Sequence, residues 1–209
     1  MSSVYAVSQD VTYSYTSNFA KLQHGLEEKF GSKSMRTINF SELDKYSEPY
    51  SLQIIGTSNY KSFLEKDKIY DIVRILYLNN IDFRLINNYV FDKLKNLKAV
   101  VINNCRNINF DELTSNLFFS KNLQQLHFKN LNFGNWCFNT NNLSELKVLT
   151  FDDCRLKKFS KISLNLEEFS ISNSKNVLDL RTLFITSVKK VIIKYCIVKL
   201  GIPRFFLIH

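Results

Sequence analysis

Apolar residues in the last two thirds of the chain recur at the first, fourth and sixth positions of a nine-residue pattern that ends in a small or apolar residue. The pattern occurs six times, and successive starts are 20 to 26 residues apart. Because the fourth and sixth positions lie on the same side of an extended chain, each occurrence predicts a short strand with that side buried. One such unit cannot bury its apolar side alone, so neighbouring units must stack with their strands in parallel. The six occurrences begin at Val73, Leu97, Leu123, Leu146, Leu166 and Val188.

The fourth position of each occurrence marks the centre of a predicted strand. A parallel sheet of at least six strands is expected, and these six residues should be almost fully buried against their counterparts one unit away. The predicted strand centres are Leu76, Val100, Leu126, Leu149, Phe169 and Val191.

The pattern and its spacing resemble the leucine-rich repeats of eukaryotic cytosolic proteins. The ninth position holds Cys105, Cys154 and Cys196, which resembles the cysteine-containing subclass of that family. The resemblance implies an α/β solenoid with a curved parallel sheet on its concave side. Short helices, 3₁₀ turns and loops would then form the convex side.

The chain divides into three predicted parts. Residues 1–34 would hold a tail and a helix in which Phe19, Leu22, Leu26 and Phe30 recur at helical spacing, and this helix is expected to cap the open N-terminal end of the repeats. Residues 35–72 would form degenerate repeats or part of that cap. Residues 73–209 would hold about six repeats, and their C-terminal end looks uncapped because only the segment RFFLIH follows the last one.

The composition narrows the class of protein. No stretch approaches the roughly 18 apolar residues of a membrane span, and the N-terminus lacks the features of a secretory signal, so an intracellular location in cytoplasm or nucleus is expected. The repeat cysteines would lie about 10 Å apart, beyond the roughly 7 Å Cα limit for a disulfide, and reduced thiols are expected. Without a C-x-x-C pair or clustered histidines, no metal site and no cofactor are predicted.

The net charge of +9 is concentrated in the repeats. Residues 1–70 carry eight basic and eight acidic side chains, whereas the segment from Arg155 to the end carries 11 basic and three acidic ones. A surface of this sign attracts acidic proteins, RNA or anionic membranes. The alternative is a merely solvated lysine-rich face.

In the leucine-rich repeat geometry, positions two, three, five, seven and eight form the concave face, which is the family's usual binding surface. Lysines and arginines recur at position two, and amides recur at positions seven and eight. An acidic protein surface is expected to dock on the lysines of the last repeats. The predicted partner-binding residues are Arg74, Tyr77, Lys98, His127, Lys129, Lys147, Lys189, Lys190, Lys194 and Tyr195.

The predicted function is a non-catalytic protein–protein interaction module, acting as a monomer or within a hetero-complex. Two alternatives stay open: an F-box-type substrate receptor of a ubiquitin ligase, and an RNA-binding protein using the basic C-terminal repeats and exposed tyrosines. Catalysis is not expected. His127, Thr150 and Ser170 would stack in one column near Asp152, but nothing in the sequence supplies an oxyanion hole.

Overall fold

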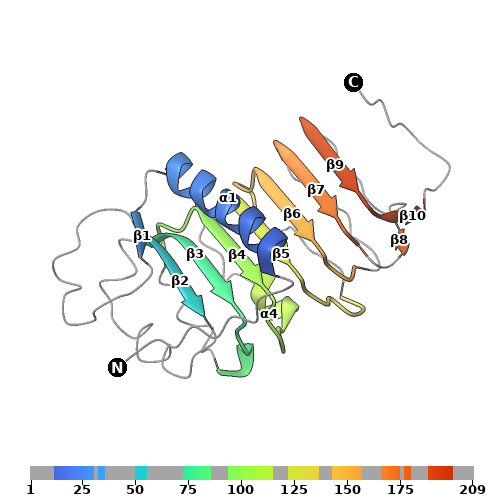
Figure 1. Cartoon of the computed structure of the whole chain (residues 1–209), viewed down its shortest axis with the longest axis horizontal. Helices are drawn as coiled ribbons and strands as arrows, with labels where there is room; N and C mark the ends of the chain where they lie inside the picture. Colours follow the sequence, from blue (N-terminus) through green and yellow to red (C-terminus); the bar gives the residue numbers. More distant parts are fainter. Residues whose placement is uncertain are drawn as a thin grey trace.

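The computed structural model describes residues 12–30, 33–35, 50–55, 73–85, 94–114, 122–136, 143–156, 166–174, 177–179 and 188–199. Figure 1 shows one long sheet with a helix lying across part of it. The helical elements are α1 (Thr12–Phe30), η2 (Phe83–Leu85) and α4 (Phe110–Thr114). The strands are β1 (Lys33–Met35), β2 (Tyr50–Ile55), β3 (Val73–Asn79), β4 (Ala99–Asn103), β5 (Gln125–Lys129), β6 (Val148–Asp152), β7 (Glu168–Ser172), β8 (Val177–Asp179), β9 (Lys190–Lys194) and β10 (Ile197–Lys199).

Within the described residues, eight strands form one parallel sheet in the order β1-β2-β3-β4-β5-β6-β7-β9. The predicted register is confirmed: Leu76 pairs with Val100, and the fourth positions continue in line to Val191. The sheet also extends into the predicted 35–72 segment, because Leu52 of β2 aligns with Leu76 of β3. The segment 36–49, with the pattern around Ile38 and Phe40, lies outside the described residues.

A second, narrower parallel ladder accompanies the sheet. β8 pairs with β10, and isolated parallel bridges join Asp82 to Arg106 and Asn132 to Arg155. Each unit therefore forms a strand, turns, and then pairs again with its neighbour, which is the arrangement of a solenoid. In the described parts of the returns, the helical elements are η2 and α4. No helix in the described part of the chain has the length and apolar character to cross a membrane.

The turn after each strand has one backbone conformation, set by the eighth position. The residue there has a positive φ between 49° and 57° in all six units. Asparagine and aspartate tolerate this left-handed conformation better than other non-glycine residues, which explains why they recur. The eighth-position residues are Asn80, Asn104, Asn130, Asp153, Asn173 and Tyr195.

The core is built from the first, fourth and sixth positions, as predicted, and five of the six strand centres are completely buried. Phenylalanines at position six stack along the solenoid, with ring centroids of Phe128 and Phe151 5.3 Å apart. The prediction was wrong for Val191, which is 47% exposed. The reason is that β9 is the last strand of the described sheet, so no strand covers the far side of this side chain.

The cysteines at position nine satisfy backbone carbonyl groups. The Sγ atom of Cys154 lies 3.5 Å from the carbonyl oxygen of Phe128 and 3.4 Å from that of Asp152. Cys105 and Cys196 make the same pair of contacts in their own units. All three are free thiols, whereas Cys137 lies outside the described residues.

The structure corrects the predicted position of the N-terminal helix. α1 does not cap the end of the sheet, because β2 and β1 extend the sheet beyond β3 on that side. Instead, Leu26 of α1 is buried against Ile75, Tyr77 and Val101, on the side of β3 and β4 opposite the solenoid core. The helix packs there because the third and fifth positions of these two strands are apolar.

Candidate interaction surface

The side of the sheet that α1 contacts is formed by the third, fifth and seventh positions of the strands, and we call it the helix-side face. Its character changes along the solenoid. β3 and β4 place apolar residues at positions three and five, whereas the equivalent positions of β7 are Glu168 and Ser170. An amphipathic helix gains stability only where it buries apolar surface. The sequence of the face therefore determines which strands α1 covers.

Polar contacts fix α1 in place beside this apolar cluster. The Tyr77 hydroxyl donates to the backbone carbonyl of Gln23 at 3.3 Å. Glu27 accepts from the Ser51 hydroxyl of β2 at 2.6 Å and from the Gln23 amide at 3.1 Å. Burial, reinforced by the charge of Glu27, raises the pKa of Tyr77 far above its usual value. Tyr77, predicted to contact a partner, is therefore a completely buried residue that anchors the helix.

His127 of β5 was also predicted to bind a partner, and it too is buried. Its Nε2 lies 3.1 Å from Oε1 of Gln125, and its Nδ1 lies 2.8 Å from the Thr150 hydroxyl. Because the amide oxygen only accepts, Nε2 carries the hydrogen and Nδ1 accepts from Thr150. Burial, with a smaller contribution from the charge of Lys29, lowers the pKa of His127 to about 4. The ring is therefore neutral at physiological pH and shielded from a docking partner.

The acid expected near His127 is engaged elsewhere. Asp152 lies 3.3 Å from the ammonium group of Lys129, and its Oδ1 accepts at 2.7 Å from both Ser172 and Asn173. Gln125, a neutral amide, occupies the place that an orienting carboxylate would take beside the histidine. The polar side chains around His127 and Asp152 are therefore hydrogen-bonded or ion-paired to one another.

Lys129 was also predicted to bind a partner, but it lacks an accessible side chain. It is buried, and its side chain is paired with Asp152. Arg74 and Lys98, from β3 and the segment before β4, are half-buried at the second position, which lies at the start of each strand. The covered part of the sheet therefore brings none of the predicted basic residues together as a fully exposed group.

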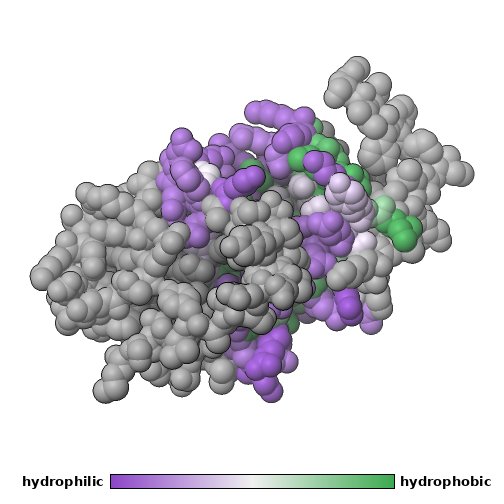
Figure 2. Space-filling model, viewed as in Figure 1, coloured by the Kyte–Doolittle hydropathy of each residue, from purple (hydrophilic) through white to green (hydrophobic). Residues whose placement is uncertain are grey.

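β6, β7 and β9 carry the part of the helix-side face that no helix or strand of the described residues covers, and we call this part the open face. Figure 2 shows this side of the molecule, with hydrophilic side chains over α1 and hydrophobic ones reaching the surface near β9. Its third, fifth and seventh positions are half-buried or exposed. The open face comprises Val148, Thr150, Asp152, Glu168, Ser170, Ser172, Lys190, Ile192 and Lys194, with Lys147, Glu167 and Lys189 along its rim.

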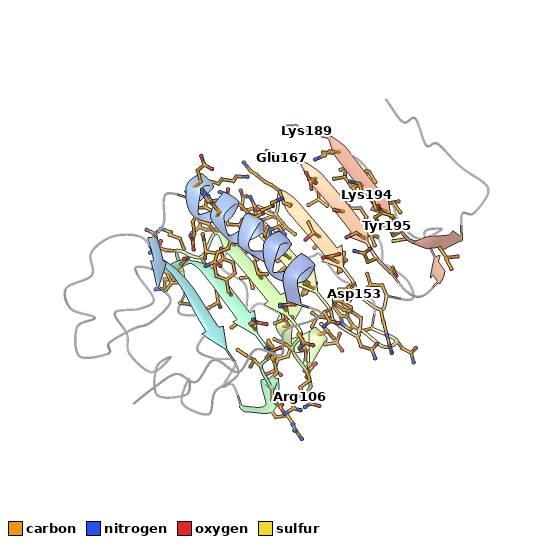
Figure 3. The ribbon with its side chains drawn as sticks, viewed as in Figure 1. Arg106, Asp153, Glu167, Lys189, Lys194 and Tyr195 are labelled. Carbon is orange, nitrogen blue, oxygen red and sulfur yellow. The ribbon has the colours of Figure 1, made fainter. Side chains whose placement is uncertain are left out.

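Charges on the open face alternate from strand to strand. Glu167 lies between two lysines, 3.8 Å from the Nζ of Lys147 and 4.0 Å from that of Lys189. In the next row, the Nζ of Lys190 lies 2.9 Å from Oε2 of Glu168. Figure 3 shows Glu167 and Lys189 at the neighbouring starts of β7 and β9, and Lys194 farther along β9. The structure thus places three of the predicted C-terminal lysines, Lys147, Lys189 and Lys190, beside glutamates in alternating order, whereas Lys194 lies at the other end of β9.

The predicted amide rim is a structural feature. Asn104 donates from Nδ2 to Oδ1 of Asn80 at 2.5 Å, and Asn130 donates to Asn104 at 3.0 Å. At position seven, Asn103 donates to Asn79 at 2.9 Å. These side chains hold successive units together, and the positive φ angles of Asn80, Asn104 and Asn130 identify these three as turn residues.

A second charged cluster lies at the turns that follow β3 and β4. The carboxylate of Asp82 accepts from Arg84 at 2.7 Å and from Asn107 at 3.0 Å, and it lies 3.2 Å from Nε of Arg106. The Arg84 guanidinium holds the pKa of Asp82 well below its usual range. This carboxylate ties two turns together. In the described part of the chain, no group of three or more histidine, cysteine, aspartate or glutamate residues could hold a metal ion.

Comparison of the chain with protein-family models, with curated proteins and with solved structures finds no match.

Proposed function

We propose that this protein is a non-catalytic protein–protein interaction module of the leucine-rich repeat type, and that its partner docks on the open face. The observation that carries the proposal is the unequal covering of one continuous sheet. α1 occupies the face over β3 and β4, whereas β6, β7 and β9 present hydroxyl groups and alternating charges to solvent. A polar, accessible face on a rigid array of strands is a typical binding surface.

The ladder of charges favours a protein partner over RNA. Single-stranded RNA binding needs exposed aromatic platforms among positive charges. Of the two tyrosines predicted to contact a partner, Tyr77 is buried and Tyr195 alone is exposed, and Lys147, Lys189 and Lys190 each lie beside a glutamate. A protein surface with its own alternating charges complements such a face, whereas a uniformly negative backbone meets Glu167 and Glu168 as well as the lysines.

The test is quantitative affinity capture from the native cell with matched variants. Ser170→Arg places a long charged side chain in the middle of the open face, and Lys189→Glu with Lys194→Glu reverses two of its charges. The control is Arg155→Glu, because Arg155 is exposed at the tenth position, away from this face. We expect the control to retain partners that both face variants lose by about tenfold, a loss of about 1.4 kcal/mol.

If both face variants retained every partner, the open face would be excluded as the binding site. Treatment with RNase separates the alternatives, because loss of all associations after digestion would assign RNA binding. Enrichment of ubiquitin-ligase subunits among the captured proteins would assign the F-box-type receptor role.

A further inference from the structure

The open edge of the sheet, at β9, carries backbone groups arranged to receive another strand. In each preceding unit the third-position N–H points back to the previous strand; for example, Glu168 N–H donates to the carbonyl of Lys147 at 3.0 Å. Since these directions alternate along a strand, the N–H and C=O groups of Val191 and Ile193 point away from β7. Among the described residues, none pairs with this edge of β9.

The backbone groups that bind at the start and at the end of each strand pairing are also present at the β9 edge. The second-position carbonyl accepts from the next strand in the first four units, as Lys147 does from Glu167 at 2.7 Å, whereas in the fifth unit the first-position carbonyl of Leu166 accepts from Lys189 at 3.3 Å. The eighth-position N–H donates to the next strand, as Asn173 does to the carbonyl of Lys194 at 3.0 Å. In the last unit the equivalent groups belong to Lys189 and Tyr195. Every backbone group that binds a following strand elsewhere in the sheet is therefore repeated on β9.

Apolar side chains reach the surface at the same edge. Val191 and Ile193, at the core positions of β9, are 47% and 38% exposed, and Ile197 is exposed beside them. In the other units these core positions are completely buried by neighbours on both sides. Figure 2 shows the resulting hydrophobic surface near β9. An added strand with apolar residues at its fourth and sixth positions would cover it.

The charges of β9 specify the chemistry of that strand. The ladder runs from Lys147 through Glu167 to Lys189, so the next member in sequence is acidic. Lys190 and Lys194 are exposed beside it on the open face. A second copy of β9 fits poorly, because antiparallel self-pairing about Ile192 would place Lys190 opposite Lys194 twice. The occupant that fits is an acidic strand.

Tyr195 is an independent indication that the β9 edge is a binding site. It has a φ of 54° at the turn position that the five other units fill with asparagine or aspartate, and its side chain is 84% exposed. A left-handed conformation costs an ordinary L-residue about 1–2 kcal/mol. A residue that breaks the local rule without gaining a packing contact is expected at a functional position.

We propose that the β9 edge binds an extended segment of a partner protein as a ninth parallel strand, with acidic residues opposite Lys189 and Lys190 and apolar residues opposite Val191 and Ile193. The chain itself contains a strand of this chemistry, because β7 pairs with the other edge of β9 through Glu167 and Glu168. The proposal rests on the proposed function only in taking the partner to be a protein. It uses the backbone edge of β9 and the two lysines that border it, and not the side chains of β6 and β7 on the open face.

The first experiment measures peptide binding to the full chain. The probe is a labelled peptide of sequence Leu-Glu-Glu-Phe-Ser-Ile-Ser, that of residues 166–172, and the control peptide has Lys-Lys in place of Glu-Glu. We expect the acidic peptide to bind about tenfold more tightly by fluorescence anisotropy, and to slow hydrogen exchange at the amides of Val191 and Ile193. Equal binding of the two peptides, or none at about 1 mM, would overturn the proposal.

A charge-swapped protein tests whether the ladder selects the strand. Glu167→Lys and Glu168→Lys, combined with Lys189→Glu and Lys190→Glu, preserve the ion pairs between β7 and β9 while reversing the sign of the edge. This protein should prefer the Lys-Lys peptide by about tenfold. An unchanged preference for the acidic peptide would show that these charges do not select the occupant and would contradict the proposal.

Two single variants separate the edge from the rest of the molecule. Val191→Pro removes an N–H from the open edge without removing a bond to β7, and it should abolish peptide binding while the circular dichroism spectrum is kept. Tyr195→Asn should fold at least as stably as the wild type but bind the peptide several-fold more weakly. Unchanged binding by both variants would exclude the β9 edge.

The open-face variant Ser170→Arg distinguishes this proposal from the proposed function. It should lose cellular partners that dock on the face but bind the acidic peptide as the wild type does. Loss of peptide binding in Ser170→Arg, with Val191→Pro still binding, would place the peptide on the open face instead of the edge.

Discussion

β3 and β4, under α1, and β6 and β7, on the open face, belong to one sheet and share one register, yet within the described residues α1 covers only the first pair. Their core positions are equally apolar and equally buried. They differ at positions three and five, where Ile75 and Val101 of the covered strands contrast with Glu168 and Ser170 of the open ones. The repeat pattern therefore determines how the strands stack, whereas the positions between its apolar residues determine what lies on the sheet.

The energetics of α1 follow from this difference. Most of a helix's stability in a folded protein comes from packing of its apolar face, so packing must hold the 19-residue α1. Burying a large apolar side chain contributes about 1.5–3 kcal/mol, and Ile75, Tyr77 and Val101 are completely buried with Leu26 above them. Over β7 the same helix would gain no apolar burial and would desolvate Glu168 instead.

The largest effect is expected from a charge placed under α1. Val101→Asp buries an unpaired carboxylate between the sheet and the helix, and we expect a loss of about 3–5 kcal/mol in the free energy of unfolding, measured by urea denaturation. Ser170→Asp is the matched control, since it makes the same side chain at the same position of an open strand. Its effect should stay within about 0.5 kcal/mol. Equal losses in the two variants would show that α1 does not seal the face in solution.

The buried histidine makes the stability of the folded protein depend on pH. The pKa of His127 is lowered to about 4 in the folded protein, against an ordinary value of 6.5. The unfolded chain therefore binds a proton at a higher pH than the folded one, so stability is lost as the pH falls from about 6.5 to about 4. The loss is at most about 3 kcal/mol. His127→Gln should flatten the stability curve across this range, and an unchanged slope would contradict the assignment.

Cys154 and Cys196 occupy equivalent turns but differ in burial. Cys154 is buried between two units, where desolvation raises its pKa to about 12, whereas Cys196 is half-buried in the last unit. Cys154→Ser replaces a weakly polar thiol, which contacts two backbone carbonyl oxygens, with a more strongly hydrated hydroxyl on a shorter bond, and we expect a cost of about 1–3 kcal/mol. Cys196→Ser should cost about 0.5 kcal/mol or less. Thermal unfolding of the two variants checks the order, and a larger loss for Cys196→Ser would reverse it.

The stacking of the strands could be predicted from the sequence, because it depends on residues that repeat. Each fourth and sixth position needs an apolar neighbour one unit away, so the register from Leu76 to Phe169 follows from the spacing alone. The exposure of Val191 did not follow from the repeat, since a pattern describes an inner unit and not the last strand of the described sheet.

The covering by α1 depends on residues that do not repeat. A signal was present: Ile75, Tyr77, Ala99 and Val101 are apolar at positions that a solvated face would fill with polar residues. The ion pairs of the open face depend on the register between Glu167, Lys147 and Lys189, which also follows from the spacing. The net charge of the segment from Arg155 to the end did not reveal this alternation. Two of its three acidic residues, Glu167 and Glu168, are adjacent at the start of β7.

Two ion pairs, one beside the covered region and one on the open face, are expected to differ slightly in coupling energy. Lys129 and Asp152 lie 3.3 Å apart beside the buried network of His127, with the lysine side chain 9% exposed, whereas the Lys190 side chain of the Lys190–Glu168 pair is 61% exposed. Double-mutant cycles to alanine should give a coupling of about 1 kcal/mol for the first pair and about 0.2–0.5 kcal/mol for the second. Because salt screens exposed charges more than buried ones, about 1 M salt should remove most of the second coupling and leave the first. Equal couplings with equal salt dependence would mean that both pairs are solvated alike, and that the covering by α1 ends before it reaches Lys129.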